Sequence, residues 1–533
     1  HKEYRRQRQM CIRDSYSALA ANTIGVNNVA VGYNSLLNNT TGVDNTAVGT
    51  AALGSNTIGY QNTALGRVSL NSNTTGINNT AVGYNSLTYN TTGVNNTAVG
   101  TNALSANTIG GYCTAIGFEA LKANTTAGSN VAIGAFSQTT TTTGANNTSV
   151  GTDSLRTNTG GVQNVAIGVQ ALYTNTTGSN NSALGMNALY YNTVGINNTA
   201  VGLSALSANT TGSYNVAIGT YALDANTIGT ENIGIGQDAL GSNTTGVHNT
   251  AVGIGSLSSA STATDNVAVG YLSQQFTTGG INNASLGAYA LRANTTGNDN
   301  TAIGYESMAA NTVGVRNVSM GRGSLYANIT GYDNTAIGWR ALNANIGAIC
   351  NTAIGRDALL NNIGNNNTAV GYTALAANTS GAELTALGVN ALTTNTTGVY
   401  NTAVGTNALL YNTFGTNNTA VGHTSLGSTT TGIQNTAVGK DAGSTTTTGS
   451  NNTMLGYQAA ASSATVSNTI TLGNSSIATL RCQVTSITAL SDARDKKDVE
   501  DLPVGLDFIN KLRPVKFTWD MRPSKDENGN DVV

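Results

Sequence analysis

The stretch NNTAVGYNSLTYNTTG, residues 78–93, decides the fold, because close variants of it fill most of the 533-residue chain. The glycine of each AVG or AIG serves as a marker. It recurs 27 times between Gly32 and Gly473, and 25 of the 26 intervals are 17 residues long. Self-similarity at a fixed period indicates stacked structural units, each of which depends on its neighbours.

Seventeen residues are too few for two helices and their connections, but they suit one coil of a solenoid with two short strands and two turns. No proline occurs between Tyr16 and Leu490, which agrees with strands because proline removes a donor from the ladder. The marker glycine and a second glycine ten residues later are expected to form corners with positive φ. The positions of this second glycine include Gly42, Gly76 and Gly93. The sequence therefore predicts an all-β, parallel β-solenoid (β-roll) over residues 16–473.

The charged residues indicate which positions face water. Counted from the marker glycine, every charge between Gly32 and Gly473 falls at +1, +2, +5 or +12, and unpaired charges are rarely buried. The leucine at +4 and the Val, Ile or Leu at +16 are therefore expected inside. The alanine at +15 points to the opposite side of the strand from +16, so it is expected to form a second, close-packed face.

A single coil of this kind is slender. It buries about two large apolar side chains, each contributing about 1.5–3 kcal/mol, whereas ordering the backbone costs about 1–2 kcal/mol per residue. We therefore expect further burial against other chains, with the alanine face as the contact.

Composition excludes several classes of function. The net charge is −2, so bulk electrostatics favour neither nucleic acid nor an anionic membrane. The four cysteines lie far apart without metal-ligand spacing, and no apolar run is long enough for membrane insertion. No cofactor or metal is predicted. Residues 1–15 resemble a translated sequencing-adaptor sequence and are expected to be non-native, the alternative being a genuine basic arm; the natural N-terminus is then expected to be missing.

The repeat motif N-x-[TV]-A-[VI]-G-x-x-[AS]-L resembles the head repeats of trimeric autotransporter adhesins, the YadA-like heads. The resemblance covers about residues 20–473, although the present period is longer than the usual head repeat. It implies a left-handed parallel β-roll in which three chains pack side by side.

Tyrosines recur at the outward positions, and exposed aromatic rings can stack on sugars or anchor a protein partner. The candidates for surface binding are Tyr33, Tyr84, Tyr271, Tyr305 and Tyr372. The alternative is a passive spacer with aromatic ladders along one flank. The acids are scattered singly over many coils, so no glycosidase pair is expected, and His248 and His423 are interpreted as isolated surface variants.

The composition changes after Gly473. Residues 474–490 alternate as a strand-like connector, and residues 491–533 hold 18 of the 48 charges and all three prolines. A helix is expected after Pro503, followed by a strand in PVKFTWD. Residues of the type Ser491–Asp492 ordinarily cap a helix.

The segments SDARDKK and GLDFINKLRPVKFTW resemble the start of the endosialidase-type intramolecular chaperone domain of phage tail spikes and fibres. In that family the domain helps three chains assemble a β-rich rod and then cuts itself off. The resemblance implies that Ser491 is the nucleophile, that Lys496 is the base with Lys497 as a competing candidate, and that the Leu490–Ser491 bond is cut. Family members continue beyond this point, so the domain is expected to be incomplete here.

Together these features predict a phage tail fibre located in the virion tail. It would be a homotrimer that attaches to a host-surface glycan or protein, and its only enzymatic step would be that of a self-cleaving serine endopeptidase. The alternative is a non-enzymatic adhesin stalk on a bacterial cell surface. A minor alternative is an ice- or polysaccharide-binding solenoid.

Overall fold

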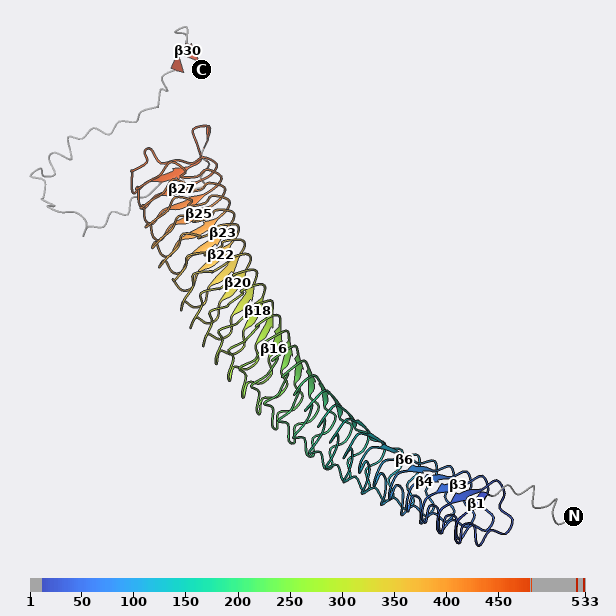
Figure 1. Cartoon of the computed structure of the whole chain (residues 1–533). Helices are drawn as coiled ribbons and strands as arrows, with labels where there is room; N and C mark the ends of the chain where they lie inside the picture. The colour runs from blue at the N-terminus through green and yellow to red at the C-terminus, as the bar shows by residue number, and fades with distance from the viewer. Residues whose placement is uncertain (1–11, 480, 482–523, 526–530, 533) are drawn as a thin grey trace, which may run out of the picture. The chain divides into compact units, whose positions relative to one another are not determined.

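The computed structural model describes residues 12–479, Arg481, residues 524–525 and residues 531–532. The chain divides into two units, His1–Ser476 and Ile477–Val533. In the first unit, 28 strands form one parallel sheet in which each strand pairs with the next along the chain. The described part of this unit is a β-solenoid, as predicted (Figure 1).

Each strand has three residues. The strands are β1 (Ile12–Asp14), β2 (Val29–Val31), β3 (Thr46–Val48), β4 (Thr63–Leu65), β5 (Thr80–Val82), β6 (Thr97–Val99), β7 (Thr114–Ile116), β8 (Val131–Ile133), β9 (Thr148–Val150), β10 (Val165–Ile167), β11 (Ser182–Leu184), β12 (Thr199–Val201), β13 (Val216–Ile218), β14 (Ile233–Ile235), β15 (Thr250–Val252), β16 (Val267–Val269), β17 (Ala284–Leu286), β18 (Thr301–Ile303), β19 (Val318–Met320), β20 (Thr335–Ile337), β21 (Thr352–Ile354), β22 (Thr368–Val370), β23 (Thr385–Leu387), β24 (Thr402–Val404), β25 (Thr419–Val421), β26 (Thr436–Val438), β27 (Thr453–Leu455) and β28 (Ile470–Leu472).

The register repeats the period of the sequence. Ala81 of β5 lies opposite Ala98 of β6, one repeat later, and the single short repeat pairs Thr352 with Thr368. The prediction of two strands per coil was wrong. In the described solenoid each coil has one strand, at positions +14 to +16, and the rest of the coil consists of turns and bends.

The segment Ile12–Asp14 continues this register, because β1 pairs with β2. Ser15 takes the place of the marker glycine, and its Oγ accepts a hydrogen bond of 3.0 Å from the backbone N–H of Gly32. That residues 1–15 are non-native stays a prediction.

The two faces of the strands are opposite to our expectation. The alanines at +15, such as Ala81, are fully buried against the +4 leucines, such as Leu87. The +16 side chains instead point outward: Leu65 is 47% exposed, Leu184 49% and Leu286 53%. The leucine row is therefore inside, as predicted, whereas the prediction for the Val, Ile and Leu row was wrong. The alanine face, which we expected to contact other chains, is the interior of the coil.

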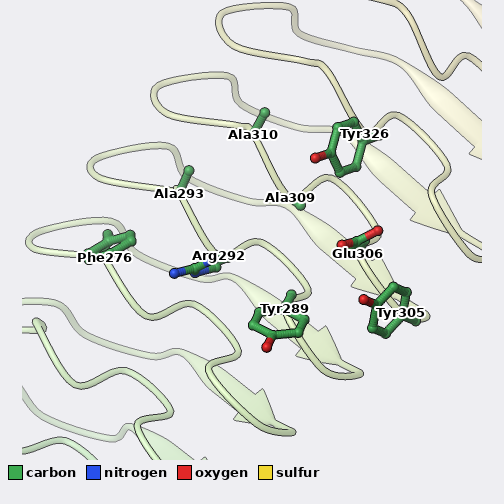
Figure 2. Close-up of a pocket in the computed structure, with 9 residues that line it drawn as sticks. All are labelled: Phe276, Tyr289, Arg292, Ala293, Tyr305, Glu306, Ala309, Ala310 and Tyr326. Atoms are coloured by element: carbon green, nitrogen blue, oxygen red, sulfur yellow. The ribbon is translucent and has the colours of Figure 1, made fainter.

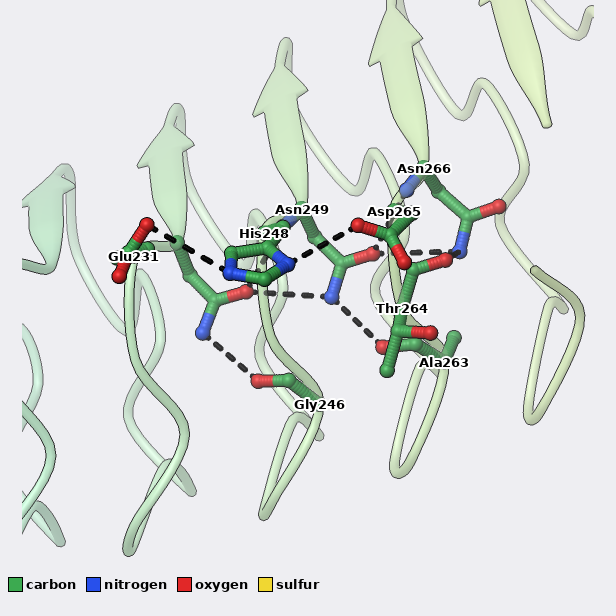
Figure 3. A network of polar contacts seen from close by, with 9 residues as sticks. Glu231, Gly246, His248, Asn249, Ala263, Thr264, Asp265 and Asn266 are labelled. Carbon is green, nitrogen blue, oxygen red and sulfur yellow. Dashed lines mark hydrogen bonds and ion pairs between the residues drawn. The ribbon is translucent and has the colours of Figure 1, made fainter. Parts of the chain in front are cut away.

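Two rows of asparagine also lie inside the coils, and the sequence analysis missed both. At +7, Asn90 donates to the side chain of Asn73 (2.8 Å) and to the carbonyl of Gly93 (3.0 Å). At +13, the side chain of Asn249 donates to the carbonyl of Ala263 at 2.7 Å (Figure 3). Its backbone N–H donates to Oδ1 of Asn232 at 3.0 Å. These ladders satisfy backbone groups that the turns leave unpaired.

The corners need left-handed backbone conformations, and the marker glycine supplies one, with φ of +127° at Gly83. The second glycine does not, contrary to prediction: Gly93 is not among the residues with positive φ. It is required for space, because a Cβ at Gly93 would collide with the carbonyl of Gly110 and the side chain of Asn90. The other left-handed corners, at +2, +4 and +12, are formed mostly by non-glycine residues, including Leu87 at +52°.

The apolar core is divided into three clusters, which span residues 18–132, 155–268 and 290–461. The two interruptions coincide with Gln138 and Gln274, which replace leucine at +4 and are fully buried. The amide nitrogen of each glutamine donates to a serine hydroxyl, Ser149 or Ser285, at 2.8 Å. A polar layer therefore separates neighbouring apolar blocks.

The asparagine ladder at +7 is interrupted as well. Thr141, Ala260 and Thr429 replace asparagine, and in each case the preceding asparagine loses the amide that would donate to it. The buried Oδ1 atoms of Asn124, Asn243 and Asn412 have no hydrogen-bond partner.

The charged side chains lie toward water, as predicted. Asp299 is exposed, and Glu119 is partly covered but pairs with Lys122 at 2.8 Å. Asp357 is the exception: only 8% of it is exposed, and it lies between Arg340 Nε (3.6 Å) and Arg356 Nε (3.2 Å). Two cations offset the desolvation of this carboxylate.

Replacing one ladder asparagine should destabilise the coil around it. Asn181→Ala removes the donor to the carbonyl of Gly195 (2.9 Å) and the acceptor for the N–H of Asn198 (3.0 Å). Each buried group left unpaired costs about 1–3 kcal/mol, so we expect a loss of about 2–6 kcal/mol. Hydrogen exchange of the neighbouring coils measures it, with exposed Thr177→Ala as the control. Equal exchange in both variants would contradict the role of the ladder.

In the second unit, β29 (Ser524–Lys525) pairs antiparallel with β30 (Asp531–Val532). Residues 474–479 contain no strand. The rest of the predicted connector apart from Arg481, the helix after Pro503 and the strand in PVKFTWD lie outside the described residues.

Candidate functional site

The five predicted surface tyrosines are all exposed: Tyr33 by 52%, Tyr84 by 50%, Tyr271 by 47%, Tyr305 by 43% and Tyr372 by 47%. They lie on separate coils and do not form one cluster. Tyr33 stacks on Tyr16, and Tyr84 lies beneath Arg67. The tyrosines at +1, directly after the marker glycine, therefore form an interrupted row along one flank.

Only Tyr271 and Tyr305 are linked through a third ring. Tyr289 lies between them and contacts each edge to face, at centroid distances of 5.4 and 5.9 Å. Tyr289 was not predicted as a binding residue, because it occupies +2, whereas the predicted tyrosines all occupy +1. The close spacing of tyrosine at 271, 289 and 305 was the available signal.

Arginines alternate with these rings. The guanidinium carbon of Arg292 lies 5.6 Å from the ring centre of Phe276 and 5.3 Å from that of Tyr289. Arg322 lies 5.5 Å from the ring of Tyr305. Such cation–π contacts contribute about 0.5–1 kcal/mol at exposed sites, and they hold the rings and the cations in fixed positions.

A groove of about 540 Å³ opens beside this cluster, as Figure 2 shows. Its centre is Ala309 and Ala310, at positions +5 and +6. The coils before and after carry Arg292 and Tyr326 at +5, whereas +6 is alanine in all three coils. The small side chain of Ala309 between two large ones therefore leaves a hollow. The complete lining is Phe276, Tyr289, Arg292, Ala293, Tyr305, Glu306, Ala309, Ala310 and Tyr326.

Glu306 and Arg292 give the groove one negative and one positive group. Among the described residues, neither side chain belongs to an ion pair. Arg292 donates instead to Oε1 of Gln275 at 2.9 Å. The negative charge of Glu306 raises the pKa of the Tyr305 hydroxyl above its ordinary value. A tyrosine hydroxyl is protonated at neutral pH even without this shift, so it can donate a hydrogen bond.

His248 is not isolated, contrary to prediction. Its ring nitrogens lie 3.0 Å from Asp265 and 3.6 Å from Glu231, which occupy the same position on the adjacent coils (Figure 3). His423 lies 3.8 Å from Asp441. Within the part of the chain that the structure describes, no group of three His, Cys, Asp or Glu side chains is arranged to hold a metal ion.

The predicted cleavage residues Leu490, Ser491 and Lys496 lie outside the described residues. Among the described residues, no helix is long and apolar enough to cross a membrane.

Comparison with known proteins identifies the C-terminal segment. Residues 491–532 match the family model Peptidase_S74, described as chaperone of endosialidase. No curated protein matches the chain. A long β-solenoid followed by this chaperone segment fits the architecture of tail-fibre proteins that carry an endosialidase chaperone.

Proposed function

We propose that this chain is the shaft of a phage tail fibre that attaches the virion to a host surface, and that its C-terminal segment is a folding domain removed by self-cleavage. The observation that carries the proposal is the chaperone match at residues 491–532, which follows a solenoid of repeated coils in the sequence. Parallel strand pairing forms slowly and leaves strand edges exposed to aggregation meanwhile, and a dedicated folding domain meets that need.

The trimer is part of the proposal, and the outward face of the strands supports it. Parallel sheets occur almost only with both faces covered, but in one chain only the alanine face is covered. Side chains such as Leu184 and Leu286 form an apolar stripe along the other face. An apolar surface of this length is typical of a protein interface, so we place three stripes around the fibre axis.

Host attachment is proposed for the flank that carries the tyrosines. Tyr84, Tyr305 and Tyr372 remain exposed at +1, outside the strand face assigned to the trimer. Rigid aromatic rings supply contact area at low entropic cost, and a repeated coil presents them many times. Weak contacts made by several copies then combine into a stable attachment.

Light scattering coupled to size exclusion tests the assembly. The chain has a mass of 54.0 kDa, and we expect three times this mass at micromolar concentration. Adsorption of the purified fibre to candidate host cells, detected by fluorescence, tests attachment separately. A folded monomer would contradict the proposed trimer, and a trimer that adsorbs to no host cell would limit the function to that of a spacer.

A further inference from the structure

The groove at Ala309 and Ala310 is concave and combines rings with two opposite charges. A smaller hollow beside it shares Glu306 and Tyr326 and adds Arg322, Trp339 and Arg340. At about 540 Å³, it falls within the range of about 300–1,000 Å³ typical of small-molecule sites. It crosses several coils, which are spaced about 4.8 Å apart, so it suits an extended ligand better than a compact one.

The rings provide surfaces for stacking. Tyr305 is 43% exposed and Tyr326 is 41% exposed, and Tyr326 has no aromatic or cationic partner among the described residues. The opposite wall carries Phe276 beneath Arg292. Flat apolar faces set among polar groups match a sugar ring, which has C–H groups on its faces and hydroxyls at its edge.

The polar groups match hydroxyls. Glu306 only accepts hydrogen bonds, Arg292 only donates them, and a hydroxyl can do both. The guanidinium of Arg292 is fixed between Phe276 and Tyr289, with Nε engaged by Gln275. Its terminal N–H groups remain available to a ligand.

Within the lining, Arg292 and Glu306 are the only ionic side chains, and their charges are opposite. Two further cations, Arg322 and Arg340, line the adjoining hollow with Glu306. A carboxylated ligand would be attracted by Arg292 but repelled by Glu306. A cationic ligand would be attracted by Glu306 but repelled by Arg292. Charge complementarity therefore favours an uncharged ligand.

From these features we propose that the groove between Phe276 and Tyr326 binds a neutral oligosaccharide, whose rings stack on Tyr305 and Tyr326 and whose hydroxyls bind Arg292 and Glu306. This inference rests on the proposed attachment function and names its ligand class. The same surface would not bind an acidic glycan with comparable strength.

Filling the groove tests the proposal without disturbing the coil. Ala309→Tyr places tyrosine at +5, a position where Tyr173, Tyr190 and Tyr326 already occur, so the variant should fold. The matched control is Ala376→Tyr, at the same position four coils later. Purified chains are applied to an array of neutral and carboxylated oligosaccharides, and the strongest neutral ligand is then titrated by calorimetry.

We expect the wild type and Ala376→Tyr to bind neutral oligosaccharides equally, and Ala309→Tyr to bind at least tenfold more weakly. Tyr326→Ala should also lose about tenfold. Preference for carboxylated sugars, absence of sugar binding, or unchanged binding by Ala309→Tyr would overturn the assignment. Host-cell adsorption measured on the same variants separates the two proposals: adsorption that survives in Ala309→Tyr retains the attachment function but removes this groove from it.

Discussion

Ser491→Ala is expected to abolish release of the C-terminal segment. Protein expressed from its full open reading frame should yield a new chain that begins at Ser491, detectable by intact mass and N-terminal sequencing. The variant should show no such chain over the same period. We expect an all-or-none effect, because the proposed mechanism takes the attacking oxygen from this residue.

The proposed chemistry is what the resemblance to the endosialidase-type chaperone domain implies, and a serine with a lysine base is able to perform it. The Ser491 hydroxyl adds to the carbonyl carbon of Leu490 while its proton passes to the amine of Lys496. The C–N bond then breaks, the Ser491 nitrogen takes that proton, and the Leu490 acyl group is held as an ester. Water hydrolyses the ester to the Leu490 carboxylate and the free hydroxyl. A neutral lysine is required, and burial or a neighbouring cation would have to lower its pKa.

The neighbouring lysine supplies a matched control. Lys496→Ala should block release as fully as Ser491→Ala, whereas Lys497→Ala should release the segment at nearly the normal rate. If Lys497→Ala blocks release and Lys496→Ala does not, the base has been assigned to the wrong lysine. If Ser491→Ala is cut as fast as the wild type, the nucleophile assignment is wrong.

The double variant Leu184→Glu, Leu286→Glu should dissociate the proposed trimer. The two leucines are 49% and 53% exposed in the single chain, and burial of each against another chain would contribute about 1.5–3 kcal/mol. Replacing both puts six carboxylates near the proposed axis, where desolvation and repulsion oppose assembly. We expect the mass measured by light scattering to fall to that of one chain.

A control with the same added charge separates repulsion at the interface from a change in net charge. Asn146→Asp with Asn180→Asp adds two acids at +12, where both asparagines are exposed. Acids already occupy this position at Asp44 and Asp299, so the control should remain trimeric. If both variants stay trimeric, the outward stripe is not the contact face.

The sequence was sufficient for the period, the strand at +14 to +16 and the leucine row, but not for the number of strands per coil. The period is visible because 25 of 26 intervals are equal. The +4 leucine could be predicted as buried because no charge occurs at that position in any repeat. The face of the strand was misjudged because size was taken as a guide to burial. In a narrow coil the alanines fit beneath Leu87 and its equivalents, and the larger Val, Ile and Leu side chains have room only outside.

The buried asparagines could not be recognised from composition, since asparagine is usually exposed. Their role depends on carbonyls in the turns, such as that of Gly93, whose orientation is set only by the folded coil. The groove depends likewise on which side chains meet between neighbouring coils. Tyr305 was predicted from its position, whereas the hollow beside it arises from Ala309, a residue with no polar or aromatic group.

The polar layers at Gln138 and Gln274 have a mechanical consequence for a filament under load. Nearest-neighbour contacts transmit stability along a solenoid, and here apolar continuity is interrupted twice, between the blocks 18–132, 155–268 and 290–461. Under tension, rupture would begin in one block and arrest at the next layer. One block would then unfold while the coils of the other blocks stay folded.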